Sequence, residues 1–362
     1  MYFKLFPNCI ITEGHEKSVI VDMHRFAYTM IENDLVVLLN RLKPTSIEKF
    51  KEKNDETVFN QLINVLYYLR DKELGFFTNI PKQFPSLDLQ WDTPSIITNA
   101  VIIVNRDNYK FISDIFFQIN SLKCRDIQIR FNYEFDLLKF SEILNIVENS
   151  RIKNIEIIFK YSLDYDESTI LSFINKNYRI NRVLIYCSPE NKTISNISFT
   201  TLNLSELTFC GETSQDSFTP NMPFFTESQH YNTCLNRKIC IDENGEIKNC
   251  PSMSLSFGNI KNTTLEEAIN KPGFKDLWGI RKDDIDVCKD CEFRYMCTDC
   301  RCFIKNPQDI YSQPAKCTYN PYIAKWQGEE AYITVEEWQQ QNHNWEKKAK
   351  RHPLIKTPQA VV

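Results

Sequence analysis

The chain has 362 residues, and its 43 lysines and arginines stand against 47 aspartates and glutamates, which gives a net charge of −4. Proteins that bind nucleic acids usually carry a basic stripe; none is evident, so no nucleic-acid partner is expected. No stretch approaches the roughly 18 uninterrupted apolar residues of a membrane span. Residues 1–9 show neither the apolar run nor the small-residue cleavage site of an export signal. We therefore expect a cytoplasmic protein that is not bound to a membrane.

Residues 1–80 predict a small module in which short strands precede helices. The helix over 57–74 has a wide apolar face, Ser46 is a typical cap for the helix before it, and Gly75 suits the end of the last helix. The expected elements are strands at 2–6, 9–12, 18–22 and 75–78 and helices at 32–42, after Ser46 and at 57–74. This order resembles the winged-helix peptide-recognition domain of ribosomal-peptide maturation systems, in which a leader peptide adds as a strand to a sheet edge.

After a proline-containing linker at 81–86, the region 90–210 alternates predicted strands with predicted helices. Strands are expected at 96–104, 126–131, 155–159 and 182–186, with more near 196–209, and helices at 109–119, 137–146 and 167–176. This alternation favours parallel βαβ topology, and hence an α/β fold with a partial or open (β/α) barrel. The acidic run of Asp164, Asp166 and Glu167 is interpreted as a solvated helix start, where carboxylates suit the helix dipole.

Nine of the thirteen cysteines fall between Cys234 and Cys317, within the region 211–325. Thiolates are soft ligands, and clusters of them hold zinc or iron–sulfur centres. Eight of the nine would serve two four-thiolate centres. The nine are Cys234, Cys240, Cys250, Cys288, Cys291, Cys297, Cys300, Cys302 and Cys317.

Three explanations compete for these cysteines. Disulfides need an oxidising compartment. No export signal is evident, so disulfides are not the favoured explanation. Zinc ribbons commonly use two C-x2-C pairs that are ~15–20 residues apart, whereas five residues separate Cys291 from Cys297, the facing ends of the two pairs here. Zinc stays open as an alternative because thiolates also form closed zinc sites. Iron–sulfur centres are the favoured interpretation.

The segment from Cys240 to Cys250 predicts a β-hairpin whose turn is Asn244-Gly245. This C-x4-G-x4-C element, followed by C-x2-C-x5-C-x2-C and a late cysteine, resembles the SPASM domain, the auxiliary-cluster module of many radical S-adenosylmethionine peptide-modifying enzymes. The resemblance implies two [4Fe–4S] clusters. It assigns the first to Cys234, Cys240, Cys250 and Cys300, and the second to Cys288, Cys291, Cys297 and Cys317. The usual pattern has three residues between its sixth and seventh cysteines, whereas two residues separate Cys297 from Cys300 here. Cys302 is therefore an alternative to Cys300 as a ligand.

A radical S-adenosylmethionine enzyme needs an early C-x3-C-x2-C loop for its catalytic cluster, and this chain has no such loop. Before Cys187 it offers only Cys9 and Cys124, and no glycine lies between Gly75 and Gly211. Glycine-rich loops let a backbone approach a nucleotide closely, and neither G-x-G-x-x-G nor a P-loop occurs. We therefore expect no S-adenosylmethionine cofactor.

The stretches 240–251 and 288–301 resemble the SPASM-domain peptide maturase of the grasp-with-spasm system, a degenerate radical S-adenosylmethionine/SPASM family. The resemblance implies a protein that binds a ribosomal precursor peptide and works beside an ATP-grasp ligase. It leaves open whether the chain is itself an enzyme. The alternatives are an iron–sulfur redox enzyme that modifies the peptide directly and a structural zinc-binding scaffold.

Three further stretches have plainer interpretations. The run at 281–284 is taken as a mixed surface turn, and His230 as a loop histidine. Residues 326–362 are expected to form a C-terminal helix and tail. Thr334 would cap this helix, and its tryptophans, Trp338 and Trp345, share one face that we expect to dock onto the chain itself.

Overall fold

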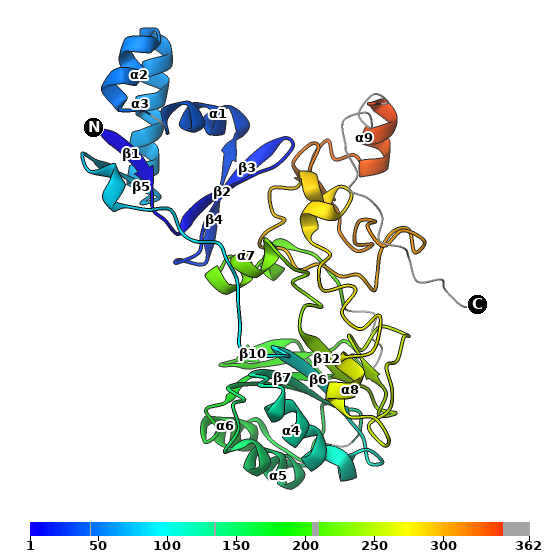
Figure 1. The fold of residues 1–362 in the computed structure, drawn as a ribbon. Coiled ribbons are helices and arrows are strands. Elements are labelled where there is room, and N and C mark those ends of the chain that lie inside the picture. The colour runs from blue at the N-terminus through cyan, green and yellow to red at the C-terminus, as the bar shows by residue number, and fades with distance from the viewer. Residues whose placement is uncertain (44, 134, 205–209, 343–362) are drawn as a thin grey trace. The chain divides into compact units, whose positions relative to one another are not determined.

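The computed structural model describes residues 1–43, 45–133, 135–204 and 210–342 (Figure 1). Contacts divide the chain into two compact units. Unit 1 contains Met1–Trp91, Gly211–Thr233 and the residues from Ile280 onward, and unit 2 contains Asp92–Cys210 and Cys234–Gly279. The region 211–325 therefore supplies residues to both units. Within the described part of the chain, no helix is long and apolar enough to cross a membrane.

The N-terminal part of unit 1 contains two small antiparallel sheets and three helices. One sheet has the strand order β2-β3-β4, and the other pairs β1 with β5. The elements are β1 (Tyr2–Leu5), β2 (Cys9–Glu13), β3 (Lys17–Asp22), β4 (Ala27–Glu32), α1 (Asn33–Leu42), α2 (Ile47–Lys53), α3 (Glu56–Asp71) and β5 (Gly75–Thr78).

The helices of this module begin at polar caps and bury one apolar stripe. Ser46 and Asp55 accept hydrogen bonds from backbone N–H groups three residues further on, which satisfies donors that a helix N-terminus leaves unpaired. Leu62, Leu66 and Leu69 recur at helical spacing on α3 and are fully buried. Four strands and three helices predicted for this module are therefore confirmed. Strand β4 was not predicted, because its hydrophobic pattern is weak and only Ile31 is buried.

Unit 2 is a mixed α/β unit with one eight-stranded sheet of order β10-β11-β9-β8-β7-β6-β12-β13. Its strands are β6 (Asn99–Val104), β7 (Asp126–Phe131), β8 (Asn154–Lys160), β9 (Ile180–Tyr186), β10 (Lys192–Ile194), β11 (Ile197–Thr200), β12 (Lys238–Ile241) and β13 (Ile247–Lys248). The inner pairs are parallel, and the pairs at both ends, β10–β11 and β12–β13, are antiparallel. The predicted α/β fold with parallel βαβ units is confirmed, and in the described residues β10 and β13 are the two terminal strands of the sheet.

The helices α4 (Ile112–Ser121), α5 (Leu137–Val147) and α6 (Glu167–Asn175) lie on one face of this sheet (Figure 1). They pack on alternate strand residues, which form one continuous core that includes Phe131 and Phe140. The short helix α8 (Leu265–Ile269) also contributes Leu265 to that core. Strand β6 begins at Asn99, later than expected, because Ile96 and Ile97 both donate to the carbonyl of Leu122 in a turn.

The opposite face of the sheet is polar in its middle strands. Gln128 on β7 stands directly opposite Glu156 on β8 and donates to its carboxylate, and Arg182 on β9 pairs with the same carboxylate at 3.4 Å. In the same register row, Val101 stands opposite both Gln128 and Cys240. Because directly paired residues share a sheet face, Cys240 lies on this polar face.

The remaining elements of unit 1 are short. They are α7 (Met222–Ser228), β14 (Tyr319–Asn320), β15 (Lys325–Trp326), α9 (Val335–Gln341) and 3₁₀ turns at Pro81–Gln83, Gln215–Ser217, Lys282–Asp284 and Cys288–Asp290. In unit 2, a further 3₁₀ turn at Tyr109–Phe111 precedes α4. Thr334 caps α9 as expected. Trp338 stacks on Tyr322 with ring centroids 4.2 Å apart, which confirms that this tryptophan docks onto the chain itself. Trp345 lies outside the described residues.

Two adjacent phenylalanines of α4 test this packing. Phe116 is 2% exposed and Phe117 is 71% exposed. We expect Phe116→Ala to lower the free energy of unfolding by about 3–5 kcal/mol, since it leaves a cavity in the core, and Phe117→Ala to change it by less than about 0.5 kcal/mol. Urea unfolding combined with hydrogen exchange of the β6 and β7 amides measures both. Equal effects of the two substitutions would contradict the observed orientation of α4.

Candidate metal centres

Four cysteines of the predicted second centre line one small cavity in unit 1: Cys288, Cys291, Cys297 and Cys317. The first two are positioned by a 3₁₀ turn, in which the N–H of Cys291 donates to the carbonyl of Cys288 at 3.0 Å. Cys317 is held from another direction by a parallel bridge to Thr213. The tertiary structure thus brings together four cysteines from separate turns, as a four-thiolate centre requires.

A buried lysine lies among these thiols. Lys282 is 5% exposed, and its Nζ lies 3.5 Å from Cys297 Sγ and 3.8 Å from Cys288 Sγ. Burial opposes the charge on Lys282, but the neighbouring thiols and Asp299 outweigh burial and raise its pKa well above the usual value. The expectation that 281–284 is a surface turn was wrong for Lys282: the sequence shows a charged run, but only the tertiary structure shows where this side chain points.

Burial also determines the state of the thiols. It raises the pKa of Cys288 to about 11, although Lys282 works in the opposite direction. Burial likewise raises the pKa of Cys297 and of Cys317. Because thiolates, not thiols, are metal ligands, binding of a metal at neutral pH would have to release these protons. Binding of a metal centre to these cysteines would therefore depend on pH and become more favourable as the pH rises.

Asp299 anchors the loop that follows these cysteines. Its carboxylate is 1% exposed and lies 2.7 Å from Arg301 Nη2, 3.7 Å from Lys282 Nζ and 2.6 Å from the Asn232 amide nitrogen that donates to it. Arg301 in turn donates to the carbonyls of Ile310 and Ser312, each at 2.8 Å. Buried charges are stable when they are paired and hydrogen-bonded in this way. Asp299 and Arg301 alternate with Cys300 and Cys302, so the ion pair fixes the backbone that carries both cysteines.

The predicted first centre is divided between the units. Cys234, Cys240 and Cys250 belong to unit 2, and Cys300, which is 5% exposed, belongs to unit 1. Cys302 is half-buried in unit 1. Within unit 1, Cys300 packs against Gly211, where an added Cβ would lie 2.9 Å from Cys300 Sγ.

The predicted hairpin is confirmed, and it holds two of these cysteines. Cys240 on β12 pairs with Lys248 on β13, and Cys250 follows β13. The turn needs glycine at Gly245, where φ is +81° and an added Cβ would lie 2.9 Å from Ile260 Cγ1. Because β12 also pairs with β6, the hairpin extends the large sheet of unit 2.

A second lysine, Lys238, faces the cysteines of the hairpin. Its Nζ lies 4.0 Å from Cys234 Sγ. The thiol of Cys234, followed by those of Cys250, Cys210 and Cys240, raises the pKa of Lys238. A hydrogen bond with Cys210, followed by burial, raises the pKa of Cys250. Cys210 was not predicted as a site residue, because it stands alone in the sequence and belongs to no spacing motif.

The chemistry of these donors fits iron–sulfur clusters. Cysteine thiolates are the usual ligands of [4Fe–4S] centres, and each unit gathers several thiols beside one ammonium group. No set of three or more His, Cys, Asp or Glu side chains in the described residues already has the arrangement of ligands around a single metal ion. His230 is no part of such a set; its Nε2 lies 3.1 Å from the carbonyl oxygen of Leu89.

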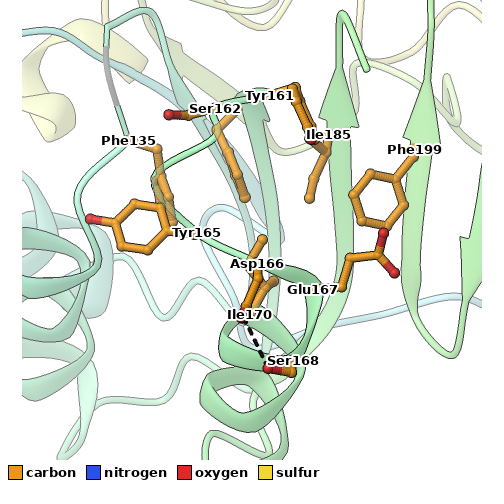
Figure 2. Close-up of a pocket in the computed structure, with 11 residues that line it drawn as sticks. Phe135, Tyr161, Ser162, Tyr165, Asp166, Glu167, Ser168, Ile170, Ile185 and Phe199 are labelled. Atoms are coloured by element: carbon orange, nitrogen blue, oxygen red, sulfur yellow. Dashed lines mark hydrogen bonds between the residues drawn. The ribbon is translucent and has the colours of Figure 1, made fainter. Parts of the chain in front are cut away.

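Unit 2 contains a separate cavity of about 380 Å³ at the carboxyl ends of β8, β9 and β11 (Figure 2). Aromatic rings form much of its wall, and Phe135 stacks on Phe159 with centroids 3.9 Å apart. The N-terminus of α6 lies at the other side, where Asp166 accepts from the N–H of Thr169 at 2.7 Å. The interpretation of this acidic run as a helix start is confirmed. Ligands of open α/β sheets commonly bind at this edge of the sheet.

Alanine substitutions of the second set test its role as a metal centre. We expect Cys288→Ala and Cys317→Ala each to remove one of two clusters, about four of eight irons, and to destabilise unit 1 because metal binding is coupled to folding. Cys302→Ala should retain both clusters if Cys300 is the ligand. Iron, sulfide and zinc are measured after purification without oxygen. Cys9→Ala and Cys124→Ala are the controls with unchanged iron, and about two zinc without sulfide would contradict the iron–sulfur assignment.

The charge of Lys282 gives a second test. Cluster potentials depend on net charge and on hydrogen bonds to sulfur, so Lys282→Met should make the reduction of one cluster harder. We expect a negative shift of about 60 mV or more, which is a tenfold change for a one-electron couple. Lys289→Met is the matched control, since Lys289 pairs with Asp286 at 3.0 Å instead. A redox titration followed by electron paramagnetic resonance measures both, and equal shifts would contradict a specific effect of Lys282.

Comparison with known proteins gives one family match. Residues 233–292 match the family model of the SPASM iron–sulfur cluster-binding domain. This segment contains Cys234, Cys240, Cys250, Cys288 and Cys291. No curated protein matches the chain.

Two solved structures match the chain at low identity and low TM-score. One is Streptococcus suis SuiB, with 13% identity and a TM-score of 0.29; the match covers 83% of this chain and 96% of SuiB. The other is Streptococcus suis SuiB bound to S-adenosylmethionine, with 12% identity, a TM-score of 0.30, and coverage of 87% and 99% respectively. Residues 233–292 are therefore the part of the chain that these comparisons relate to an iron–sulfur cluster-binding domain.

Proposed function

We propose that this chain is a maturation protein for a ribosomally synthesised precursor peptide, that it carries two auxiliary [4Fe–4S] clusters, and that it acts beside an ATP-grasp ligase. The observation that supports this most directly is the cavity lined by Cys288, Cys291, Cys297 and Cys317. The match of residues 233–292 to the SPASM domain adds to this support. The peptide substrate and the ligase come from the resemblance of 240–251 and 288–301 to the grasp-with-spasm maturases.

The N-terminal module is proposed to bind the leader of the precursor. Strand β4 stands at one end of the order β2-β3-β4, so its outer edge can accept a further strand. Its side chains are mostly exposed or half-buried, and Met30 is 36% exposed. In this proposal the module works like the winged-helix peptide-recognition domains, where backbone hydrogen bonds supply affinity and side-chain pockets supply specificity.

The sheet of unit 2 is proposed to hold the core of the precursor. The aromatic cavity beside α6 supports this, because ligand sites are typically apolar with a few polar groups. The clusters, when bound, would clamp their turns and offer a route for electrons. The residues of this chain bind and orient the peptide, and the ligase joins a side-chain carboxylate of the precursor to a hydroxyl or amine.

Titration of the full chain with a synthetic leader peptide tests the proposal. We expect one leader to bind per chain, because one sheet edge is proposed as its site, with heat detectable by calorimetry and a shift on gel filtration. A leader of the same composition in scrambled order is the control. Absence of both heat and shift with the native leader would rule out leader binding.

The redox alternative predicts a different observation. If the clusters modify the peptide directly, incubation with the precursor and a reductant, without S-adenosylmethionine, changes the precursor mass by hydrogens or by a cross-link. Binding with an unchanged mass supports the role beside a ligase. A mass change without ligase would move the chemistry to this chain.

A further inference from the structure

The cavity beside α6 has a floor made by one row of the large sheet. Phe159 on β8, Ile185 on β9 and Phe199 on β11 are directly paired, and all three line the cavity. They belong to the core on the helix-covered face and are at most 4% exposed. A helix follows each of β6, β7 and β8, whereas in the described residues only the short strand β10 connects β9 to β11. The cavity of about 380 Å³ therefore lies where the βα repeat omits a helix.

The walls of this cavity combine aromatic rings with carboxylates. Tyr161 and Tyr165 contribute rings, and Asp166 and Glu167 contribute carboxylates from the start of α6 (Figure 2). Helix N-termini attract anions, but Asp166 already accepts from the N–H of Thr169 at 2.7 Å. Hydrogen bonds from Thr169 lower the pKa of Asp166, so this carboxylate is charged at neutral pH. An anionic ligand would therefore meet negative charge on this side of the cavity.

Lys192 on β10 shows which kind of group this side of the cavity accepts. Its Nζ contacts the carboxylate of Glu167 and lies 2.8 Å from Glu190 Oε1. The same Nζ lies 5.1 Å from the ring centroid of Phe199, and aromatic faces attract cations. One ammonium thus stands against two carboxylates, and Asp166 adds a third negative charge to the cavity wall. The charge balance favours a further cation here.

We propose that this cavity is a recognition pocket for a lysine side chain in the core of the precursor. The aliphatic stem would pack on the aromatic walls, and the ammonium would lie near Glu167. The proposal rests on the proposed function, which places the precursor core on unit 2, and it names the kind of residue that is recognised. Lysine fits because it joins an apolar stem to a cationic head, whereas a carboxylate side chain would be repelled by Asp166 and Glu167.

Methyl NMR of the full-length protein tests this pocket with a small probe, Nα-acetyl-lysine N-methylamide. Ile170 and Ile185 line the cavity, so their δ1 methyl signals report its occupancy. Ile20, which is buried in unit 1, is the reference signal. We expect the lysine probe to shift the Ile170 and Ile185 signals, and the matching norleucine amide to bind about fivefold more weakly because it lacks the charge. Equal affinity for both probes, or no shift at either methyl, overturns the proposal.

Two substitutions at the cavity should act in opposite directions on the lysine probe. Glu167→Gln should weaken its binding about two- to fivefold, the range of a partly exposed ion pair. Lys192→Met should strengthen binding by a similar factor, because it removes the ammonium that already contacts Glu167. A damaged cavity would not produce this tighter binding. Glu142→Gln on α5 is the control with unchanged affinity, since Glu142 accepts from Tyr109 instead. Unchanged binding in Glu167→Gln overturns the proposal.

The probe experiment also separates this pocket from the proposed function. If the lysine probe binds selectively but the native leader does not bind, the proposed function is contradicted, and the cavity remains a lysine site without a link to a precursor. If the leader binds while the lysine and norleucine probes behave alike, the pocket assignment alone is overturned.

Discussion

The placement of buried thiols beside a buried or partly buried lysine is the constraint on which the cysteine-rich part of this protein depends. Burial raises the pKa of Cys288 to about 11, so the thiol form prevails at neutral pH unless a cation compensates the thiolate. Lys282 supplies part of that compensation, and a metal centre would supply the rest. The four cysteines lie in turns and a short 3₁₀ element, not in long helices or strands, so a bound centre would cross-link these turns.

The two sets of thiols depend on different supports. The hairpin β12–β13 continues the large sheet through the β6–β12 pairing. The backbone of Cys240 is therefore held by a parallel sheet that has helices packed on one face. The second set has no such sheet. Instead, Asp299 and Arg301 form a buried ion pair that fixes the loop from within. A lost partner in such a pair leaves an uncompensated buried charge, so this loop tolerates little change.

Unit 2 has features suited to substrate binding at two places. One face of its sheet carries the polar row of Gln128, Glu156 and Arg182, and its carboxyl edge holds the aromatic cavity beside α6. Both arise from the same parallel topology: helices cover one face, and strand ends converge at one edge. A chain without a catalytic cluster loop could still position a peptide on such a surface.

The sequence by itself determined most elements of the fold, though not β4, and the presence of a thiolate site. Alternating strands and helices between residues 90 and 210, and the turn at Gly245, follow from local propensities and periodicity. Tertiary structure alone decided that Lys282 is buried, that Asp299 pairs with Arg301, and that Cys317 lines the same cavity as Cys288. Those contacts bring together residues that are distant in sequence or hidden in charged runs. No local pattern encodes them, because they depend on where each loop packs.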